Sequence, residues 1–394
     1  MKERYKLTIE PITPVHIGTG VELTPLDYKV ASKLGRSDFK KFMYFKFSSD
    51  KILKRLIESG DINSLSQFDK ASVQGNMKEL QSFFQENFTD IDDLDYPCEV
   101  TSGFLKKYNE NQGKDPYDNA SKVYQIYRPE GLKTPVIPGS SLKGSIRTAI
   151  LNAILYNICD DEYNELKGEF NSIMNDRDKP KFESKLQKAL LGSYSDAKND
   201  PFRAIQIADC SFPAKNSQVV GELYNVSLNQ NNERLEPLGI QILAEAIKGF
   251  LMGESEKAET TLLIDTDLLR TNQIKKKISA KEIASSCNEF FEQQFYCEFK
   301  KFYEAAFDDS CNLIDKLSDI IAEIKEKNDN SFVVRVGRWS QVEFVTFGTD
   351  FRRPKTPKGK NGKPKSWGGT RTLFDYNGQY LPMGWCKCTV EKLT

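Results

Sequence analysis

Short stretches in which apolar and polar residues alternate occur in both halves of the chain, and they predict β-strands. In the first stretch Tyr5, Leu7 and Ile9 fall on one side, which predicts a half-buried strand that ends at Pro11. Further strands are expected within 202–212, 219–228, 240–247, 260–264 and 332–336.

Longer stretches with helical spacing separate these strands. One covers about 50–87, and another begins after a turn at Pro138-Gly139, with Ser140 or Ser141 as the expected N-cap. Ser279 and Glu282 match a capping box, which opens a helix whose aromatic stripe we expect to face the core. Another helix is expected over about 312–325.

The order of these elements predicts an α+β fold. We expect two sheet modules with helical insertions, residues 1–235 and 236–394, the second with a basic loop at 352–371. The length of 394 residues suits two or more domains. Hydrophobic residues make up 39% of the chain, enough for a buried core.

The charge and the amino-acid composition limit which ligands and which location we expect for this protein. The 56 basic and 56 acidic residues cancel, so any polyanion must be bound by local clusters. The eight cysteines form no C-x-x-C pair and there is one histidine, so we expect neither a metal site nor a cofactor. No apolar run approaches the roughly 18 residues of a membrane span and no signal peptide is visible, so we expect a cytoplasmic protein.

The segment Ile137 to Ile150 is the first candidate for phosphate binding. A strand end, a Gly-Ser-Ser turn and a helix start would place several free backbone amides together, and a helix N-terminus favours an anion. Lys143 and Arg147 lie four apart and would share one helix face. An ordinary capped helix is the alternative on residue chemistry alone.

The second candidate is a basic stretch near the C-terminus that contains no acidic residue. Its cations could follow several phosphates, with Trp367 available to stack on a base, and the alternative is a solvated loop. The cations are Arg352, Arg353, Lys355, Lys358, Lys360, Lys363, Lys365 and Arg371.

Pro138 to Arg147 resembles the hallmark segment of the RAMP superfamily of CRISPR-associated proteins. Thr13 to Gly20, followed by Leu26-Asp27-Tyr28, resembles the family of subunits that cap the 3′ side of the guide RNA in type III-A (Csm) complexes. Three more segments fit in the expected order: 205–212, 335–339 and 381–385.

This resemblance implies two ferredoxin-like (RRM-like) modules in a non-catalytic subunit, which ends the backbone filament, holds the 3′ part of the crRNA and assists its 3′-end maturation. The implied partners are crRNA and target RNA, the adjacent backbone subunit and other Csm subunits, and host ribonucleases, with no membrane. A capping subunit of the related Cmr complex is an alternative. The implied RNA contacts are His16, Gly18, Thr19, Gly20, Gly139, Ser140, Ser141, Lys143, Arg147 and Arg338.

Two side chains carry the alternative interpretation as an enzyme. His16 could act as general acid or base in a RAMP endoribonuclease that processes the guide precursor, although no titrating partner is evident nearby. Asp27 is the other candidate, because backbone subunits of these complexes cut target RNA with a loop aspartate. An aspartate that stabilises its own turn is the favoured interpretation of Asp27.

Overall fold

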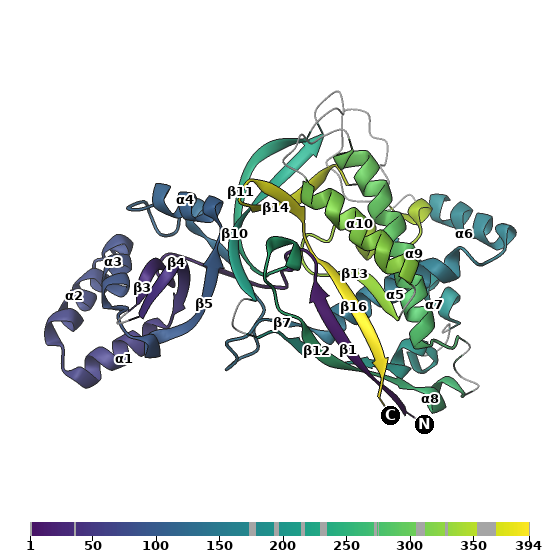
Figure 1. Ribbon diagram of the computed structural model, residues 1–394, viewed down its shortest axis with the longest axis horizontal. Helices are drawn as coiled ribbons and strands as arrows, with labels where there is room; N and C mark the ends of the chain where they lie inside the picture. The colour runs from purple at the N-terminus through teal and green to yellow at the C-terminus, as the bar shows by residue number, and fades with distance from the viewer. Residues whose placement is uncertain are drawn as a thin grey trace.

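The computed structural model confirms a mixed α+β fold (Figure 1). It describes residues 2–34, 37–172, 179–192, 197–213, 217–228, 235–271, 274, 276–304, 312–327, 330–352 and 368–393. Two main sheets are present in these ranges, together with a two-stranded pair formed by β7 (Val136–Ile137) and β9 (Cys210–Ser211).

The first sheet is five-stranded, and its central strand is β1 (Lys2–Pro11). Leu7 and Ile9 of this strand are fully buried, as their alternation with polar residues predicts. The order is β13 (Ser331–Arg335), β16 (Trp385–Lys392), β1, β12 (Ala258–Asp265) and β8 (Ile205–Ile207).

Three long helices share one hydrophobic core with this sheet. They are α5 (Gly139–Leu155), α9 (Ala280–Glu298) and α10 (Asn312–Lys327), with α9 continued by the π-helical turn Phe299–Tyr303. Ser279 and Glu282 form the predicted capping box of α9. The aromatic stripe of α9 faces the core, because Phe290, Phe291 and Phe295 are buried.

The second sheet carries the other strands. Along its main path the order is β2 (Gly18–Leu23), β6 (Val123–Ile126), β11 (Leu235–Ile247), β10 (Gln218–Leu228), β5 (Leu94–Val100), β4 (Ser37–Phe47) and β3 (Tyr28–Leu34). Two C-terminal strands join at β10: β14 (Thr370–Tyr376) and, beside it, β15 (Gln379–Pro382).

The far end of the second sheet carries a separate helical lobe (Figure 1). It contains α1 (Ser49–Ser59), α2 (Ile62–Val73) and α3 (Met77–Asn87), which confirms the predicted helical block at 50–87. Phe47, Phe84 and Phe88 belong to a core of its own. The remaining helices are α4 (Ser102–Glu110), α6 (Asp160–Ser172), α7 (Lys179–Leu191), α8 (Thr266–Leu269) and α11 (Val342–Val345).

The sheets do not follow the predicted division at residue 235. β10 and β11 pair directly across that position, and β1 pairs with β12 and β16 from the second segment. Both main sheets therefore combine strands from the two predicted segments, and among the described strands only the β7–β9 pair lies within one of them. Among the helices that the structure describes, none is both long enough and apolar enough to cross a membrane.

Candidate nucleic-acid interface

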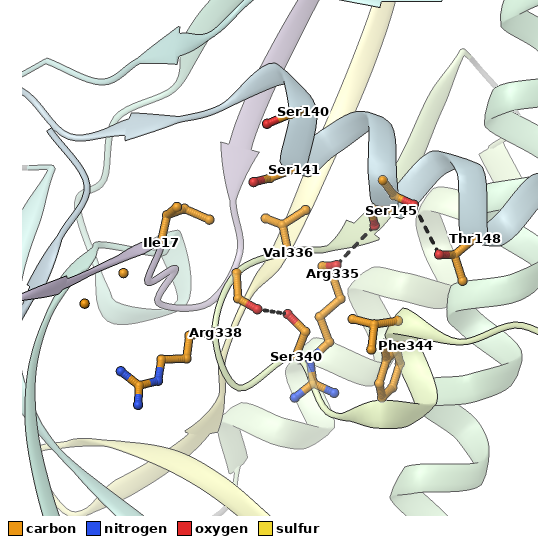
Figure 2. A pocket seen from close by; sticks show the side chains of 15 residues that line it. Ile17, Ser140, Ser141, Ser145, Thr148, Arg335, Val336, Arg338, Ser340 and Phe344 are labelled. Carbon is orange, nitrogen blue, oxygen red and sulfur yellow. Dashed lines mark hydrogen bonds between the residues drawn. The ribbon is translucent and has the colours of Figure 1, made fainter. Parts of the chain in front are cut away.

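Three segments that lie far apart in the sequence surround a cleft of about 590 Å³ (Figure 2). They are the start of β2 at 17–20, the first turns of α5 at 140–148, and the loop 336–340 that follows β13. Arg335 at the end of β13 and Phe344 and Val345 of α11 complete the lining. The cleft therefore brings together three of the segments that the sequence singled out.

The N-terminus of α5 offers fewer free amides than predicted. Gly139 N–H donates to Asp209 Oδ1 at 2.8 Å, and the amides of Ser141 and Leu142 both reach the Pro138 carbonyl. Only Ser140 N–H among the first four has no acceptor in the described part of the chain. The N-cap is Pro138 and makes no side-chain bond, so the expectation of a serine cap at Ser140 or Ser141 is wrong.

Gly139 has a packing reason to be glycine. A Cβ at this position would lie 2.0 Å from the Ile207 carbonyl oxygen, and the residue is buried. Its predicted RNA contact therefore does not fit the structure, because its amide is already bonded and its Cα faces the protein. Gly144 differs, because a Cβ there would meet nothing within 4 Å.

Hydroxyl groups dominate the α5 wall of the cleft. Ser140 is exposed, Ser141 is half-buried, and both project from the first helical turn toward the cleft (Figure 2). Thr148 lies one turn beyond Gly144 and lines the same wall. The sequence interpretation missed Thr148, although its helical spacing from Ser140 and Gly144 was visible in the sequence.

His16 lies beneath the cleft rather than in it. It is fully buried, its Nδ1 is 2.7 Å from the Glu245 carbonyl oxygen, and its ring centroid is 4.8 Å from that of Trp339. Burial lowers the pKa of His16 to about 4, against an opposing effect of the bond to Glu245. Both predictions for His16, RNA contact and general acid or base, conflict with this burial. Gly18, Thr19 and Gly20 are exposed.

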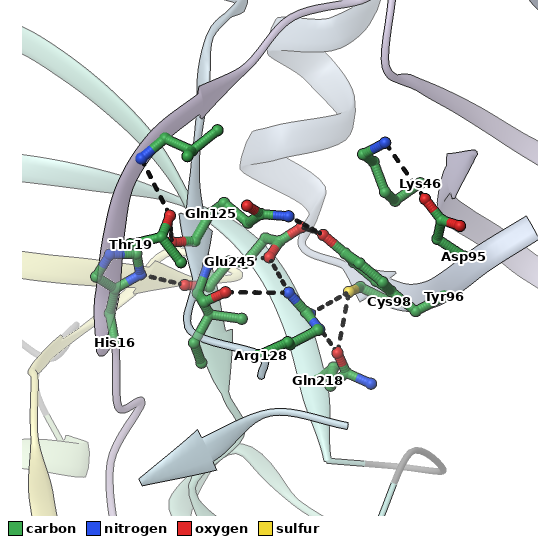
Figure 3. Close-up of polar contacts among 12 residues, drawn as sticks. His16, Thr19, Lys46, Asp95, Tyr96, Cys98, Gln125, Arg128, Gln218 and Glu245 are labelled. Carbon is green, nitrogen blue, oxygen red and sulfur yellow. Dashed lines mark hydrogen bonds and ion pairs between the residues drawn. The ribbon is translucent and has the colours of Figure 1, made fainter. Parts of the chain in front are cut away.

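A buried cluster of polar side chains holds this region in place, and we call it the Glu245 cluster (Figure 3). The Glu245 carboxylate accepts from Tyr96 Oη at 2.8 Å, Ile126 N–H at 3.1 Å and Arg128 Nη1 at 2.7 Å. The Arg128 guanidinium lies 3.5 Å from the Tyr96 ring centroid and also donates to Gln218.

Arg338 supplies an exposed cation at the cleft. Its backbone N–H donates to the His16 carbonyl oxygen at 2.8 Å. Its guanidinium carbon lies 4.3 Å from the Tyr124 ring centroid. Its side chain forms no ion pair within the described ranges. Gly337 precedes it at φ +92°, and a Cβ there would lie 2.5 Å from the His16 carbonyl oxygen. The loop geometry therefore depends on this glycine.

Lys143 and Arg147 are not part of the cleft lining. Arg147 pairs with Asp200 at 2.9 Å and donates to Gln187 at 3.3 Å. Lys143 is half-buried, and desolvation together with the neighbouring Arg147 lowers its pKa, against an opposing effect of Asp200. The structure therefore does not bring the two cations to one phosphate in the cleft.

Arg352 and Arg371 are buried, which contradicts their predicted contact with RNA. Arg371 lies 2.5 Å from Glu298 and 3.4 Å from Glu343, and Glu298 also binds Arg335 at 2.9 Å. Arg352 donates to Gln294 Oε1 at 3.2 Å and to the Glu343 carbonyl at 3.2 Å. We call these buried residues the Glu298 cluster: Glu298, Glu343, Arg335, Arg352 and Arg371.

The other predicted cations of the basic stretch, Arg353, Lys355, Lys358, Lys360, Lys363 and Lys365, lie outside the described residues, as does Trp367. The residues on either side are placed. Arg352 bonds Thr346 Oγ1 at 3.0 Å, and Gly368 N–H donates to Glu343 Oε1 at 2.6 Å. Both ends of the basic stretch therefore adjoin α11, one wall of the cleft.

Asp27 stabilises its own turn, as expected for a turn aspartate. Its Oδ2 accepts from Thr24 N–H at 2.9 Å and from Thr24 Oγ1 at 3.0 Å. The described residues contain no group of three His, Cys, Asp or Glu side chains able to hold a metal ion.

The sequence of the chain also matches a known family. The model of the RAMP superfamily matches residues 8–376, so this chain belongs to the RAMP superfamily.

Two solved structures have the same fold. One is a chain from a cryo-EM structure of a Csm–crRNA–target RNA ternary complex of a type III-A CRISPR-Cas system, with a TM-score of 0.63, 21% identity, and coverage of 99% of this chain and 100% of that one. The other is the crystal structure of T. onnurineus Csm5, with a TM-score of 0.60, 19% identity, and coverage of 96% and 99%. No curated protein sequence matches significantly.

Proposed function

We propose that this chain is a non-catalytic, Csm5-like subunit of a type III-A CRISPR complex, and that its cleft holds the sugar-phosphate backbone of the crRNA. The observation that carries the proposal is the convergence of 17–20, 140–148 and 336–340 on one cleft, lined by hydroxyl groups, a helix N-terminal amide and Arg338. Such groups bind phosphate and ribose without reading base sequence.

The charge around the cleft suits a polyanion although the chain as a whole is neutral. Arg338 is an exposed cation at the cleft. Beneath it, the Glu298 cluster places three arginines against two glutamates. Arg335 belongs to this cluster and also contributes to the cleft lining. Fixed positive charge around a cleft raises the local concentration of an anionic ligand.

The basic stretch 353–365 extends the proposed interface. The residues on either side of it, Arg352 and Gly368, are held beside α11, and the stretch contains six cations. We propose that they contact further phosphates of the same strand, which would make binding strongly salt-dependent. The role as terminal subunit of the filament and in 3′-end maturation of the crRNA belongs to this proposal, by likeness to the type III-A structures.

The absence of catalysis is also proposed from the site. His16, the acid–base candidate, is buried under Gly18, and Asp27 is bonded within its own turn. Neither side chain is placed to transfer a proton to or from RNA in the cleft.

The test compares Arg338→Ala with Arg270→Ala in the full chain. Both substitutions remove one exposed arginine, but Arg270 lies at the end of α8, outside the cleft lining. For single-stranded crRNA-length RNA, we expect Arg338→Ala to lower affinity about tenfold. The slope of log K against log salt should fall in magnitude by roughly 0.7, the value for one phosphate contact to a single strand. Arg270→Ala should leave both unchanged. Equal affinities for Arg338→Ala and the unsubstituted protein would overturn the proposal.

A further inference from the structure

A second, smaller pocket adjoins the cleft. It has a volume of about 100 Å³ and shares two lining residues with the cleft, Thr148 and Val345. It lies between α5, α7 and the segment 345–351. A strand of RNA in the cleft would therefore pass its opening.

The walls of this pocket combine apolar and polar side chains in about equal measure. Leu151, Leu186 and Phe182 are buried in the protein core at its base. Phe347 is half-buried and Val345 is 59% exposed, so the rim leaves apolar surface in contact with water. Filling the pocket with an aromatic ring would remove that surface from water, which is favourable.

The polar atoms at the pocket suit the edge of a nucleobase. Gln187 and Glu183 of α7 are lining residues, and the Glu183 carboxylate is exposed. A carboxylate accepts a hydrogen bond from a ring N–H, such as N3–H of uracil, and an amide both donates and accepts. Arg147 is another lining residue, but its guanidinium is held by Asp200 and Gln187.

The volume limits the size of the occupant. A cavity of about 150 Å³ holds one benzene molecule. The pocket at about 100 Å³ is smaller and opens on one side, so it suits the partial insertion of one ring better than that of two.

We propose that the pocket at Phe347 takes one unpaired nucleobase, a pyrimidine by preference, from the RNA strand whose backbone lies in the adjoining cleft. This inference rests on the proposed function. It adds a contact to a base that the backbone-binding cleft does not supply. It also gives Phe347 a role in binding, as the aromatic wall against which the base packs.

The experiment uses the full chain and two polymers of equal length, an oligouridylate and a ribose-phosphate chain without bases. The unsubstituted protein should bind the oligouridylate about tenfold more tightly, because stacking of a single base on an aromatic side chain is worth about that factor. Phe347→Ala should remove this preference and leave affinity for the abasic chain unchanged. An oligoadenylate should bind more weakly than the oligouridylate.

Phe42→Ala is the matched control, because Phe42 is 48% exposed on β4 and lies outside both pockets. It should retain the preference for the oligouridylate. Val345→Ser changes an exposed side chain outside the core, and it is the variant to use if Phe347→Ala fails to fold. It should also reduce the preference for the oligouridylate over the chain without bases.

The possible failures are distinguishable. If neither polymer binds, or if Arg338→Ala weakens neither, the proposed function is wrong. If both polymers bind with equal affinity and Arg338→Ala weakens the binding of both, the cleft binds the RNA backbone as proposed. The proposal that the pocket binds a base is then wrong. A preference that survives both Phe347→Ala and Val345→Ser also overturns the base pocket.

Discussion

The Glu245 and Glu298 clusters both place charge beneath the cleft, but they are built differently. Glu245 is one carboxylate that accepts from one arginine, one tyrosine and one backbone amide. The Glu298 cluster packs two carboxyl groups among three arginines, drawn from α9, α11, β13, β14 and the segment after α11. The first cluster is locally balanced in charge, and the second has one cation in excess.

This difference assigns the clusters different tasks. The Glu245 cluster anchors β6 and β11 and supports the buried His16, so it fixes the loop at 17–20. The Glu298 cluster fixes the start of the loop 336–340 through Arg335 and also adds positive charge near the cleft. A buried charge is costly without its partner, so both clusters should be sensitive to removal of their carboxylates.

The largest expected effect comes from Glu298→Gln. This substitution leaves Arg335 and Arg371 without a common carboxylate in a fully buried site. We expect the free energy of unfolding to fall by about 3–5 kcal/mol, measured by urea titration. Glu292→Gln, on the same helix, breaks only an exposed pair with Lys325 and should cost at most about 1 kcal/mol. Similar losses for the two variants would contradict the importance of the buried cluster.

The next effect concerns pH and tests the Glu245 cluster through His16. The pKa of His16 is about 4 in the folded protein, and an unfolded histidine has a pKa near 6.5. Between these values the unfolded chain binds a proton that the folded chain does not, so stability falls as pH falls. We expect His16 to account for roughly 2–3 kcal/mol of lost stability between pH 7 and pH 4.5.

The measurement is the free energy of unfolding across this pH range, for the unsubstituted protein and for His16→Gln. Since the chain has one histidine, the difference between the two pH slopes isolates its contribution. Parallel loss of stability in both proteins would show that His16 is not held in its neutral form.

The smallest expected effect concerns the half-exposed pair of Arg147 and Asp200, a contrast to both buried clusters. Arg147→Ala should cost about 1 kcal/mol of stability, because the pair is partly solvated. It should change affinity for the ribose-phosphate chain without bases less than twofold, measured by fluorescence anisotropy, because the side chain is absent from the cleft lining. Asp200→Asn should behave in the same way. If Arg147→Ala lowers the affinity strongly and Asp200→Asn does not, the result would support the phosphate contact of Arg147 that the sequence predicted.

Much of the fold could be predicted from the sequence. Alternation marked β1, helical spacing marked α5 and α9, and Ser279 with Glu282 marked the start of α9. These are local patterns, and they work because backbone geometry fixes which residues share a face. The pairing of β1 with β12 and β16 was not visible, because register across such separations depends on tertiary packing.

Three segments that the sequence singled out meet in the structure, but several individual residues lie elsewhere than expected. The segments at Gly18, Ser140 and Arg338 do converge on one cleft. His16, Arg352 and Arg371 were assigned to RNA because their chemistry suits it, but each is buried. The sequence shows that an arginine is present, but it does not show with which carboxylate the arginine pairs. The partners of Arg371 lie on helices 73 and 28 positions earlier in the chain, at Glu298 and Glu343.

The position of β1 at the centre of its sheet has a consequence for synthesis. Tyr5 lies opposite Lys392, so one edge of this strand acquires its neighbour only after nearly 390 further residues have been made. On the other edge, Lys2 lies opposite Asp265, which is also made late. During translation β1 therefore presents unpaired backbone groups on both edges, the condition in which strands pair with the wrong chain. Slow folding and a need for protection of the nascent chain follow from this topology.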